Sequence, residues 1–430
     1  MSVPIEPARE YAREQAREWT RNGDPRAESA WRQLLERGEL VEARVALAQM
    51  AYARGGAAEA LVHLQHACRA EPGNAQLLRQ LAIAAEAAGY PDEARHALEF
   101  AVQLAPGLYP AHLQLGRLQE QAGARRAAMR SYLSALTRAQ LEEKWLDEAS
   151  TPPHLRAQVA HAAAFVRAGR AEVLAGLLDP LVARHGAAAM RRVERCLSGY
   201  LGDNPVLPDD ARQQPKFLFF PELPSAPYFQ RTDFPWLERL EAACADIRDE
   251  ARAVLAEPQA LTPFLDVPAD VDLSDYLQGA SAARPHWDAF FFYRHGRAYA
   301  DNLSRCPRTA QTLESLPLVR IAEHAPEVCF SVLTAGTHIM PHHGVTNVRA
   351  VVHLPLIVPR DCVLTVGGQA HHWREGECIA FDDTWLHEAW NRGDDTRVIL
   401  LMDAWNPHLT EPEREAMTAL IEGIGEFNRG

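Results

Sequence analysis

The chain has 430 residues, a length that predicts two or three domains at roughly 150 residues each. Apolar residues make up 47% of the chain and charged residues 23%, which excludes a wholly disordered protein. Acidic residues outnumber basic ones by 57 to 44, and no long basic run occurs. Binding of nucleic acid or of an anionic membrane is therefore excluded as the main function, because that affinity needs clustered Lys and Arg.

Neither a membrane span nor a disulfide framework is expected. No stretch of about 18 apolar residues occurs. The N-terminal segment MSVPIEPAREYAREQAREW is a polar helical pattern that lacks the apolar core of a signal peptide. The seven cysteines are scattered and include no CxxC pair, as in a protein with reduced thiols. We therefore expect a cytoplasmic, multidomain protein.

The first third of the chain repeats with a period of 34 residues. Glycines, alanines, large apolar residues and prolines recur at this spacing: Gly55, Gly89 and Gly123; Ala60, Ala94 and Ala128; Leu64, Leu98 and Tyr132; Pro72 and Pro106. The period is typical of tetratricopeptide repeats, in which Gly ends the first helix, Ala permits close helix packing and Pro follows the second helix. Each unit exposes an apolar face that only a neighbouring unit can cover.

This periodicity predicts an all-α, tetratricopeptide-like solenoid over residues 1–145. The segment before the clear repeats, AESAWRQLLERGELVEARVALAQMAYARGG, is helical but out of register, as in a capping repeat. Helical character continues through residues 146–210 after a break at Pro152 and Pro153, and predicts a helical connector. The solenoid is either a scaffold or a docking surface for a peptide or protein.

The alanine-rich helical pattern ends between Pro205 and Pro215, and after Pro258 the sequence consists of short apolar runs rich in Val, Ile, Phe and Trp. After one helical segment, LERLEAACADIRDEARAVLAE, the predicted strands are HWDAFFFY, EVCFSVLTA, VRAVVHLPLIV, CVLTVGG, ECIAFD and TRVILLMDAW. Short strands without interleaved helices predict an antiparallel barrel or jelly roll over residues 211–430, and a closing helix begins at Glu411. The whole chain is thus predicted to be a multidomain α + β protein.

Histidines concentrate in one part of this second half. Seven of the eighteen lie between residues 338 and 387. Neutral imidazole is a common ligand of iron, copper and zinc, and two imidazoles on distant strands can converge inside a β-barrel. His342 and His387, on either side of the hairpin run, are the best candidate pair.

The surrounding segments resemble the aspartyl/asparaginyl β-hydroxylase family. They are PHHGVTNVRAVVHLPLIVP, WREGECIAFDDTWLHEAWN and TRVILLMDAWNPHL, and a weaker similarity reaches back to KFLFFPELPSAP. The resemblance implies a double-stranded β-helix of the jelly-roll or cupin type. It also implies Fe(II), the cosubstrate 2-oxoglutarate and O₂, used to hydroxylate the β-carbon of Asp or Asn. Repeat-type helices before the catalytic domain are known in the animal members.

Carried over by position, the resemblance makes His342 and His387 the iron ligands. Most oxygenases of this chemistry add a carboxylate, but its usual position holds Gly344, and the family shares this absence. The resemblance further implies that Arg397 binds the far carboxylate of 2-oxoglutarate with help from Ser331. His353 then contacts the other end of the cosubstrate.

One position departs from the animal enzymes, which have a basic residue where this chain has Val351. Arg349, Val351 and His353 share one face of a strand. Arg349 therefore either replaces the missing cation at 2-oxoglutarate or binds the substrate carboxylate, and both alternatives stay open. His295 is a further candidate for the substrate pocket.

The remaining polar residues of this region are given structural roles. His343 is a minor alternative to His342 as the ligand. Asp382 and Asp383 are expected to form a turn that supports the loop of His387. His338 is expected in a turn, His371 and His372 in an exposed hairpin, and the tryptophans in the core or the pocket wall, among them Trp287, Trp373, Trp385, Trp390 and Trp405.

Several functions compete at this point. The first is a hydroxylase whose peptide or protein substrate docks on the helical repeats. The second uses the same iron chemistry on a free amino acid or another small molecule, either for hydroxylation or, because Gly344 opens a coordination position, for halogenation. The third is a non-catalytic repeat adaptor with a decayed barrel, which the intact histidine pair and Arg397 disfavour.

Overall fold

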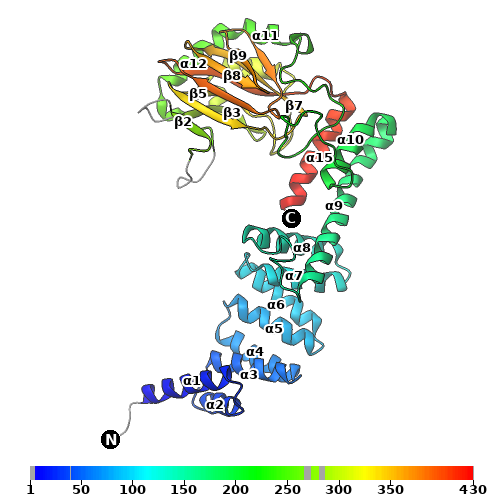
Figure 1. Cartoon of the computed structure of the whole chain (residues 1–430), viewed down its shortest axis with the longest axis vertical. Helices are drawn as coiled ribbons and strands as arrows, with labels where there is room; N and C mark the ends of the chain where they lie inside the picture. Colours follow the sequence, from blue (N-terminus) through cyan, green and yellow to red (C-terminus); the bar gives the residue numbers. More distant parts are fainter. Residues whose placement is uncertain (1–4, 39, 266–272, 280–285, 430) are drawn as a thin grey trace. The chain divides into compact units, whose positions relative to one another are not determined.

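The computed structural model describes residues 5–38, 40–265, 273–279 and 286–429. They form two compact units that divide between Arg170 and Ala171, inside a long helix (Figure 1). This boundary falls within the stretch 146–210 that the sequence predicts to be a helical connector.

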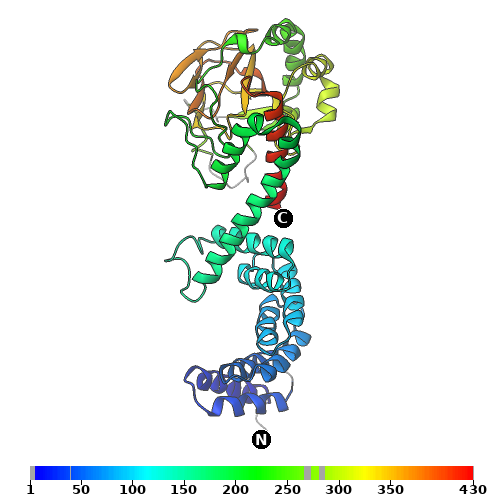
Figure 2. The ribbon, with the colours of Figure 1, turned by 90° about the vertical axis from the view of Figure 1, so that its right-hand side faces the viewer.

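The first unit is a stack of paired helices, as Figure 2 shows. They are α1 (Ile5–Arg21), α2 (Arg26–Glu36), α3 (Val41–Ala53), α4 (Ala57–Ala70), α5 (Ala75–Ala87), α6 (Pro91–Leu104), α7 (Tyr109–Gln121), α8 (Arg125–Leu141) and the start of α9 (Arg156–His185). Gly55, Gly89 and Gly123 follow α3, α5 and α7 with φ of +86°, +87° and +76°. Because an L side chain is strained at such φ, glycine is needed at these turns.

Small residues set the spacing of the stacked helices. Ala60, Ala94 and Ala128 are completely buried at equivalent places on α4, α6 and α8. At Gly116 on α7 a Cβ atom would lie 2.6 Å from the Tyr132 ring, so the two helices pack with no room for a side chain. The predicted helical repeat is confirmed.

The second unit opens with its own helical cluster. The rest of α9, α10 (Ala187–Leu201) and the closing helix α15 (Glu411–Arg429) share one apolar core, in which Leu174, Met190 and Leu420 are fully buried. The closing helix begins at Glu411, as predicted. In the buried part of this cluster, Arg192 makes two hydrogen bonds, of 2.6 and 2.7 Å, to the carboxylate of Glu413.

Two antiparallel sheets form the centre of the second unit. The strands are β1 (Thr262–Pro263), β2 (Leu277–Gly279), β3 (Trp287–Arg294), β4 (Arg297–Ala298), β5 (Val328–Leu333), β6 (Thr337–His342), β7 (Arg349–Ile357), β8 (Cys362–Val366), β9 (Gln369–His372), β10 (Ile379–Phe381), β11 (His387–Asn391) and β12 (Arg397–Trp405). The larger sheet has the order β1-β3-β5-β12-β7-β10, with β4 beside β3, and the smaller has the order β2-β6-β11-β8-β9.

The chain crosses repeatedly between the two sheets. From β5 onward it runs β5 in the larger sheet, β6 in the smaller, β7 in the larger, β8 and β9 in the smaller, then β10, β11 and β12 in alternation. This winding is the double-stranded β-helix that the sequence predicts. It brings side chains from β5, β7 and β12 to face those from β6 and β11 across the interior.

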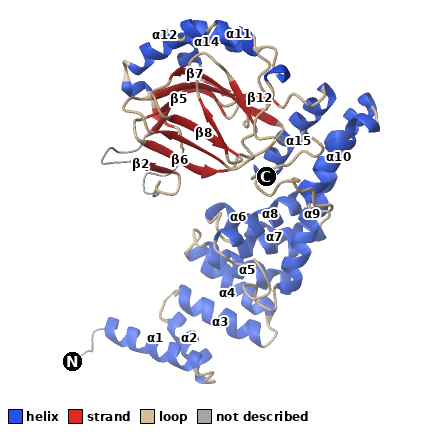
Figure 3. Ribbon diagram, turned by 45° about the horizontal axis from the view of Figure 1, so that its top comes forward, coloured by secondary structure: helices blue, strands red, loops and turns tan. Residues whose placement is uncertain are grey.

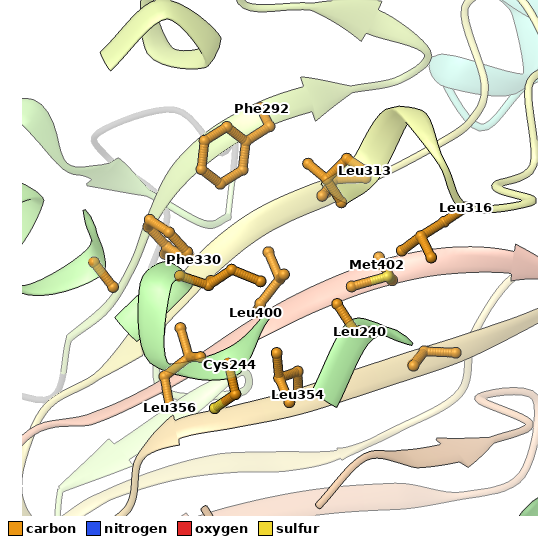
Figure 4. Close-up of a cluster of buried hydrophobic side chains, with 14 of the residues drawn as sticks. Leu240, Cys244, Phe292, Leu313, Leu316, Phe330, Leu354, Leu356, Leu400 and Met402 are labelled. Atoms are coloured by element: carbon orange, nitrogen blue, oxygen red, sulfur yellow. The ribbon is translucent and has the colours of Figure 1, made fainter. Parts of the chain in front are cut away.

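Helices cover the outer face of the larger sheet (Figure 3). They are α11 (Leu237–Ala242), α12 (Cys244–Leu255), α13 (Ala300–Arg305) and α14 (Pro307–Glu314). Figure 4 shows the core beneath them, where Leu240 and Leu313 pack against Phe330, Leu354 and Leu400 of the strands. This covered face explains why the strands read as almost continuous apolar runs.

The structure corrects several sequence predictions. The single helix predicted over residues 237–257 is divided into α11 and α12, and the strand region does contain interleaved helices, α13 and α14. Strands β6, β9 and β11 were not predicted, because their polar sequences, such as THIMPH and HEAWN, lack the β-branched alternation of an ordinary strand. His338 therefore lies in β6 and not in a turn, and His387 opens β11 and does not sit in a turn between strands.

In the described part of the chain, the helices are either too short or too polar to cross a membrane. All seven cysteines are free thiols, as predicted.

Candidate active site

A cavity of about 480 Å³ lies between the two sheets of the second unit. All six residues that the sequence singles out as an ordered set line it: Ser331, His342, Arg349, His353, His387 and Arg397. They come from five strands that only the β-helix winding brings together. Arg349, Val351 and His353 line it from one face of β7, as the period of two predicts.

His342 and His387 lie side by side on neighbouring strands of the smaller sheet. His342 ends β6 and His387 begins β11, and the two residues are direct partners in the strand pairing. Their ring centroids are 4.0 Å apart. The Nδ1 atom of His342 lies 2.8 Å from the Met340 carbonyl oxygen, and that of His387 lies 2.9 Å from the Trp385 carbonyl oxygen. Since a carbonyl only accepts, each Nδ1 carries the proton and each Nε2 keeps its lone pair.

The pair is also held in the neutral form. Burial lowers the pKa of His342, and burial together with the neighbouring His342 lowers the pKa of His387 to about 3. Two neutral imidazoles with their tautomers fixed by backbone carbonyls are a donor set that suits a transition metal. Among the described residues no group of three His, Cys, Asp or Glu is arranged to hold a metal ion, so the histidines form a two-ligand set.

Asp383 occupies the space that the small residue Gly344 leaves open. A Cβ atom built at Gly344 would lie 2.0 Å from the Asp383 Cγ atom, so any side chain there would overlap the carboxylate. Asp383 is 6% exposed, lines the cavity, and its Oδ1 atom has no hydrogen-bond partner. A carboxylate from the loop before β11 thus fills the space next to Gly344, the position at which most oxygenases of this chemistry carry their carboxylate, and it interacts electrostatically with His342.

The two acidic residues of the FDDTW segment therefore differ. Asp382 is structural, as expected: its carboxylate accepts hydrogen bonds from the Thr384 hydroxyl (2.6 Å) and from the Gln213 side chain (2.9 Å). Burial raises the pKa of Asp382 to about 7. Asp383 does not fit the structural role that the sequence suggests for it, because its side chain faces the cavity and contacts Arg349.

Arg349 is neutralised by carboxylates of the protein itself. Its Nη1 atom donates to Asp403 at 2.7 Å and its Nη2 atom to Asp383 at 3.3 Å. Burial by itself would lower the pKa of Arg349, but the charges of Asp403 and Asp383 raise it above its ordinary value. A guanidinium that already bridges two carboxylates positions Asp383 and has less charge to offer an anionic ligand.

Arg397, by contrast, is a buried cation without a counter-charge. It is 1% exposed, and within the described residues it forms no ion pair. Its Nη2 atom donates to the Ser331 hydroxyl oxygen at 3.0 Å, while its Nε atom has no partner. Burial lowers the pKa of Arg397 to about 10. A lone buried guanidinium is costly unless an anion joins it, so this end of the cavity suits a carboxylate ligand.

His353 lies near this cationic end. It is 5% exposed, and neither ring nitrogen has a hydrogen-bond partner in the structure. Burial, assisted by the charge of Arg397, lowers the pKa of His353 well below its ordinary value. A neutral imidazole with two unsatisfied nitrogens, lining the same cavity as Arg397, is prepared to bond a polar ligand.

The other histidines lie away from the centre. The His343 Nδ1 atom lies 2.9 Å from the Thr384 carbonyl oxygen, and this residue does not line the cavity. His338 pairs with Glu388 at 2.6 Å and stacks on Trp390. His295 is among the lining residues but stands at the rim, with 65% of its side chain exposed.

The sequence analysis did not predict the residues that hold the predicted site residues in place through hydrogen bonds. Asp403 and Glu327 carry no motif, yet both line the cavity, and the backbone N–H of Glu327 donates to Asp403 at 2.9 Å. Trp287, assigned to core or wall, does line the wall and also donates from Nε1 to the Ser331 oxygen at 2.9 Å. The available signal was alternation along β12, where Arg397, Ile399, Leu401 and Asp403 all face inward, as their spacing of two predicts.

The fold and this cavity define a jelly-roll protein with a buried histidine pair opposite an unpaired arginine. Residues 241–407, inside the second unit, match the family model described as "Aspartyl/Asparaginyl beta-hydroxylase". A rat protein named "Aspartate beta-hydroxylase domain-containing protein 2" is 32% identical over 250 residues, covering 56% of this chain and 68% of its own length. The chain belongs to the aspartyl/asparaginyl β-hydroxylase family, and its second unit contains the hydroxylase domain.

Two other relatives match over a similar part of this chain. The Xenopus tropicalis protein of the same name is 32% identical over 251 residues, which is 57% of this chain but 64% of that protein. The "Ornithine lipid ester-linked acyl 2-hydroxylase" of Rhizobium tropici is 32% identical over 207 residues, covering 47% of this chain and 69% of its own length. The chain thus spans about two thirds of the length of these relatives.

Proposed function

We propose that this protein is an Fe(II)- and 2-oxoglutarate-dependent dioxygenase that hydroxylates its substrate. The observation that carries the proposal is the pair of neutral, tautomer-fixed imidazoles with centroids 4.0 Å apart, in the same cavity as a buried arginine without a counter-charge. One feature suits a metal and the other a carboxylate. When bound, iron, 2-oxoglutarate and O₂ would together supply the oxidant for an unactivated C–H bond, with one oxygen atom going to succinate and the other to the hydroxylated product as CO₂ is released.

Each residue has a role in this scheme. The Nε2 atoms of His342 and His387 would hold the metal, and Asp383 would accept a hydrogen bond from water beside it. Arg397 and Ser331 would hold the distal carboxylate of the cosubstrate, and His353 would bond its other end. The apolar side chains between these groups, including Val351, Ile399 and Leu401, exclude bulk water from the reacting centre.

For the substrate we propose the β-carbon of an Asp or Asn residue in a peptide or protein, as the family name suggests. The helical repeats support a peptide partner, because a hollow of about 570 Å³ lies in the first unit between α7, α8 and the start of α9. The seven free thiols support a reducing, cytoplasmic setting.

A small-molecule or lipid substrate is the second candidate. The relative from Rhizobium tropici is named as a lipid hydroxylase at the same 32% identity, so family membership alone does not choose the substrate. The charge of Arg349 is already shared between Asp403 and Asp383, which weakens the case for it as the receptor of a substrate carboxylate. Halogenation is disfavoured, because Asp383 fills the space at Gly344 and would repel a halide.

Anaerobic reconstitution tests the iron and cosubstrate assignment. Full-length protein with Fe(II) and 2-oxoglutarate should show a weak metal-to-ligand charge-transfer band in the visible range. His342→Ala and His387→Ala should each abolish this band and reduce succinate release by about a thousandfold or more, because no third protein ligand remains to hold the metal.

His343→Ala is the matched control, since His343 is the chain neighbour of His342 but faces the Thr384 carbonyl. It should keep the band. If both alanine variants of the pair retain the band, the metal assignment is wrong. If the band is present but neither Asp and Asn peptides nor lipids stimulate succinate release, the substrate proposal fails and the cofactor proposal stands.

A further inference from the structure

The hydroxyl group of Ser331 receives two hydrogen bonds at once. Trp287 Nε1 donates to its oxygen at 2.9 Å and Arg397 Nη2 donates to it at 3.0 Å. A serine hydroxyl has two acceptor lone pairs and one proton to give. Both lone pairs are therefore occupied by N–H groups, neither of which can act as an acceptor. Within the described residues the Ser331 hydroxyl donates to no protein acceptor.

Trp287 cannot easily turn away from this contact. Its ring is stacked on Phe264, with centroids 3.9 Å apart and planes 7° from parallel. Its carbonyl oxygen accepts the backbone N–H of Phe264 at 2.9 Å, and its backbone is paired with Leu333 in the β3–β5 ladder. The indole N–H is thus directed at Ser331 by packing on one side and strand register on the other.

We propose that Trp287 is a positioning residue that turns the Ser331 hydroxyl proton into the cavity and makes this end of it donor-only. Ser331 is 1% exposed and lines the cavity, and none of the described residues accepts its proton, so that proton is available to a group bound in the cavity. Arg397 presents only N–H groups at the same place. A ligand group that contacts both residues must therefore be able to accept hydrogen bonds at each of its polar atoms. A carboxylate can do this, because both of its oxygens are acceptors.

The consequence is a specificity rule that rests on the proposed function. A carboxamide offers one acceptor oxygen and one donor NH₂, and its NH₂ would meet N–H or O–H donors here. The amide N–H groups of the ligand and the N–H and O–H groups of the site would then all lack an acceptor. Such buried, unpaired donors cost binding free energy, so the site rejects the amide although it has almost the same shape as the acid. Without the indole N–H, the Ser331 oxygen regains a free lone pair and can accept from the amide. Trp287 thereby sets the preference for a terminal carboxylate over its amide.

Calorimetric titration of the full-length protein loaded with Mn(II) tests this rule without turnover. The probes are N-oxalylglycine, a stable 2-oxoglutarate analogue, and its terminal amide, oxalylglycinamide. The wild type should bind the acid at least about tenfold more tightly than the amide. Trp287→Phe keeps a stacking ring but lacks the N–H, and should bind the acid about three- to tenfold more weakly while the acid-to-amide ratio falls.

Ser331→Ala separates positioning from packing. In this background Trp287→Phe should change neither the affinity for the acid nor the acid-to-amide ratio, because the hydroxyl that the indole directs is gone. Trp236→Phe is the matched control, since Trp236 packs against Phe234 outside the cavity, and it should bind both probes as the wild type does. Trp287→Leu provides a second variant that lacks the indole N–H and has no other side-chain donor, if Trp287→Phe does not fold.

The outcomes distinguish the inference from the proposed function. If Trp287→Phe and Trp287→Leu keep the wild-type ratio while Arg397→Ala loses the acid, the positioning role is overturned and the cosubstrate site stands. If Trp287→Phe weakens both probes equally, also in the Ser331→Ala background, its role is packing alone and the inference fails. If Arg397→Ala binds the acid normally, the carboxylate site itself is misplaced and both proposals fall.

Discussion

The two units of this protein are built in contrasting ways. In the repeat unit, packed helices follow one another along the chain, and the pattern recurs every 34 residues. In the second unit, which is the catalytic unit of the proposed hydroxylase, Arg397 pairs with Leu333 and Trp405 with Arg349, partners 64 and 56 residues apart. Charge differs too: residues 1–170 contain 21 basic and 20 acidic residues, whereas residues 171–430 contain 23 and 37.

The difference shows where function can be placed in each architecture. The stability of a solenoid is the sum of many similar interfaces between neighbouring repeats. Surface residues of one repeat can therefore change without affecting the structure of distant repeats. The β-helix concentrates five strands on one cavity, so the geometry of its site depends on every register at once. Substitutions of the same kind should therefore have local effects in the repeat unit and site-wide effects in the catalytic unit.

Outside the histidine pair, the largest effect is expected from Gly344→Ala. The added Cβ must displace the Asp383 carboxylate, whose Cγ atom would lie 2.0 Å away. Because Asp383 would stand next to the proposed metal site, we expect metal affinity to fall about 10- to 100-fold, measured by competition with a chelating dye. The double variant Gly344→Ala/Asp383→Gly should recover thermal stability but not metal affinity. Wild-type affinity in Gly344→Ala would contradict the placement of Asp383.

The next effect concerns the hollow of the repeat unit. Ala157→Trp should fill it beside Tyr132 and His161, since all three residues line it. If substrate docks there, KM for a peptide substrate should rise about tenfold with kcat unchanged, because only binding outside the catalytic centre is lost. Steady-state kinetics would show this, with a short peptide that spans the catalytic cavity alone as the control. An unchanged KM for long and short peptides would mean that the repeats do not recruit the substrate.

The third prediction concerns pH and the metal-free protein. The folded state holds the pKa of His387 at about 3, whereas in the unfolded chain it is about 6.5. Between these values the unfolded state binds more protons, so stability is full above pH 6.5 and is lost as pH falls toward 3. Urea melts should show about 1 kcal/mol less stability per pH unit in this window for the catalytic unit. His387→Gln should flatten the slope, and replacing the exposed His372 should not.

The smallest effect is expected from Gly89→Ala in the repeat unit. Nothing lies within 4 Å of the added Cβ, so the cost is only that of a side chain at φ +87°, about 1 kcal/mol. Thermal unfolding of the repeat unit should shift slightly while metal binding by the catalytic unit stays unchanged. If Gly89→Ala lowered metal affinity as much as Gly344→Ala, substitutions in the repeat unit would not have only local effects, and the proposed difference between the two units would be wrong.

The sequence predicted the site unevenly. The density of histidines selected His342 and His387, and the spacing of two along β7 placed Arg349 and His353 on one face. Ser331 and Arg397 were selected by the resemblance to the family, and the alternation along β12 that would have added Asp403 was not used. Asp383 was assigned to a turn, since its place beside Gly344 depends on two loops that approach each other only in the folded β-helix. Trp287 was assigned to the core or the pocket wall, and its hydrogen bond to Ser331 was not foreseen, since that bond depends on the diagonal register of β3 and β5.

The amino-acid sequence by itself determined the solenoid, because its 34-residue period reflects contacts between neighbours along the chain. For the second unit the strand pattern indicated a barrel or jelly roll, and the motifs that resemble the family indicated the double-stranded β-helix and the residues around the histidine pair. Only the tertiary structure decided that Arg349 is bridged by two carboxylates while Arg397 has none, and that Ser331 has one direction left for its proton. These partners are decided by which charged groups and hydrogen-bond donors come together in the buried cavity. That depends both on burial and on the pairing of strands that lie far apart in the sequence.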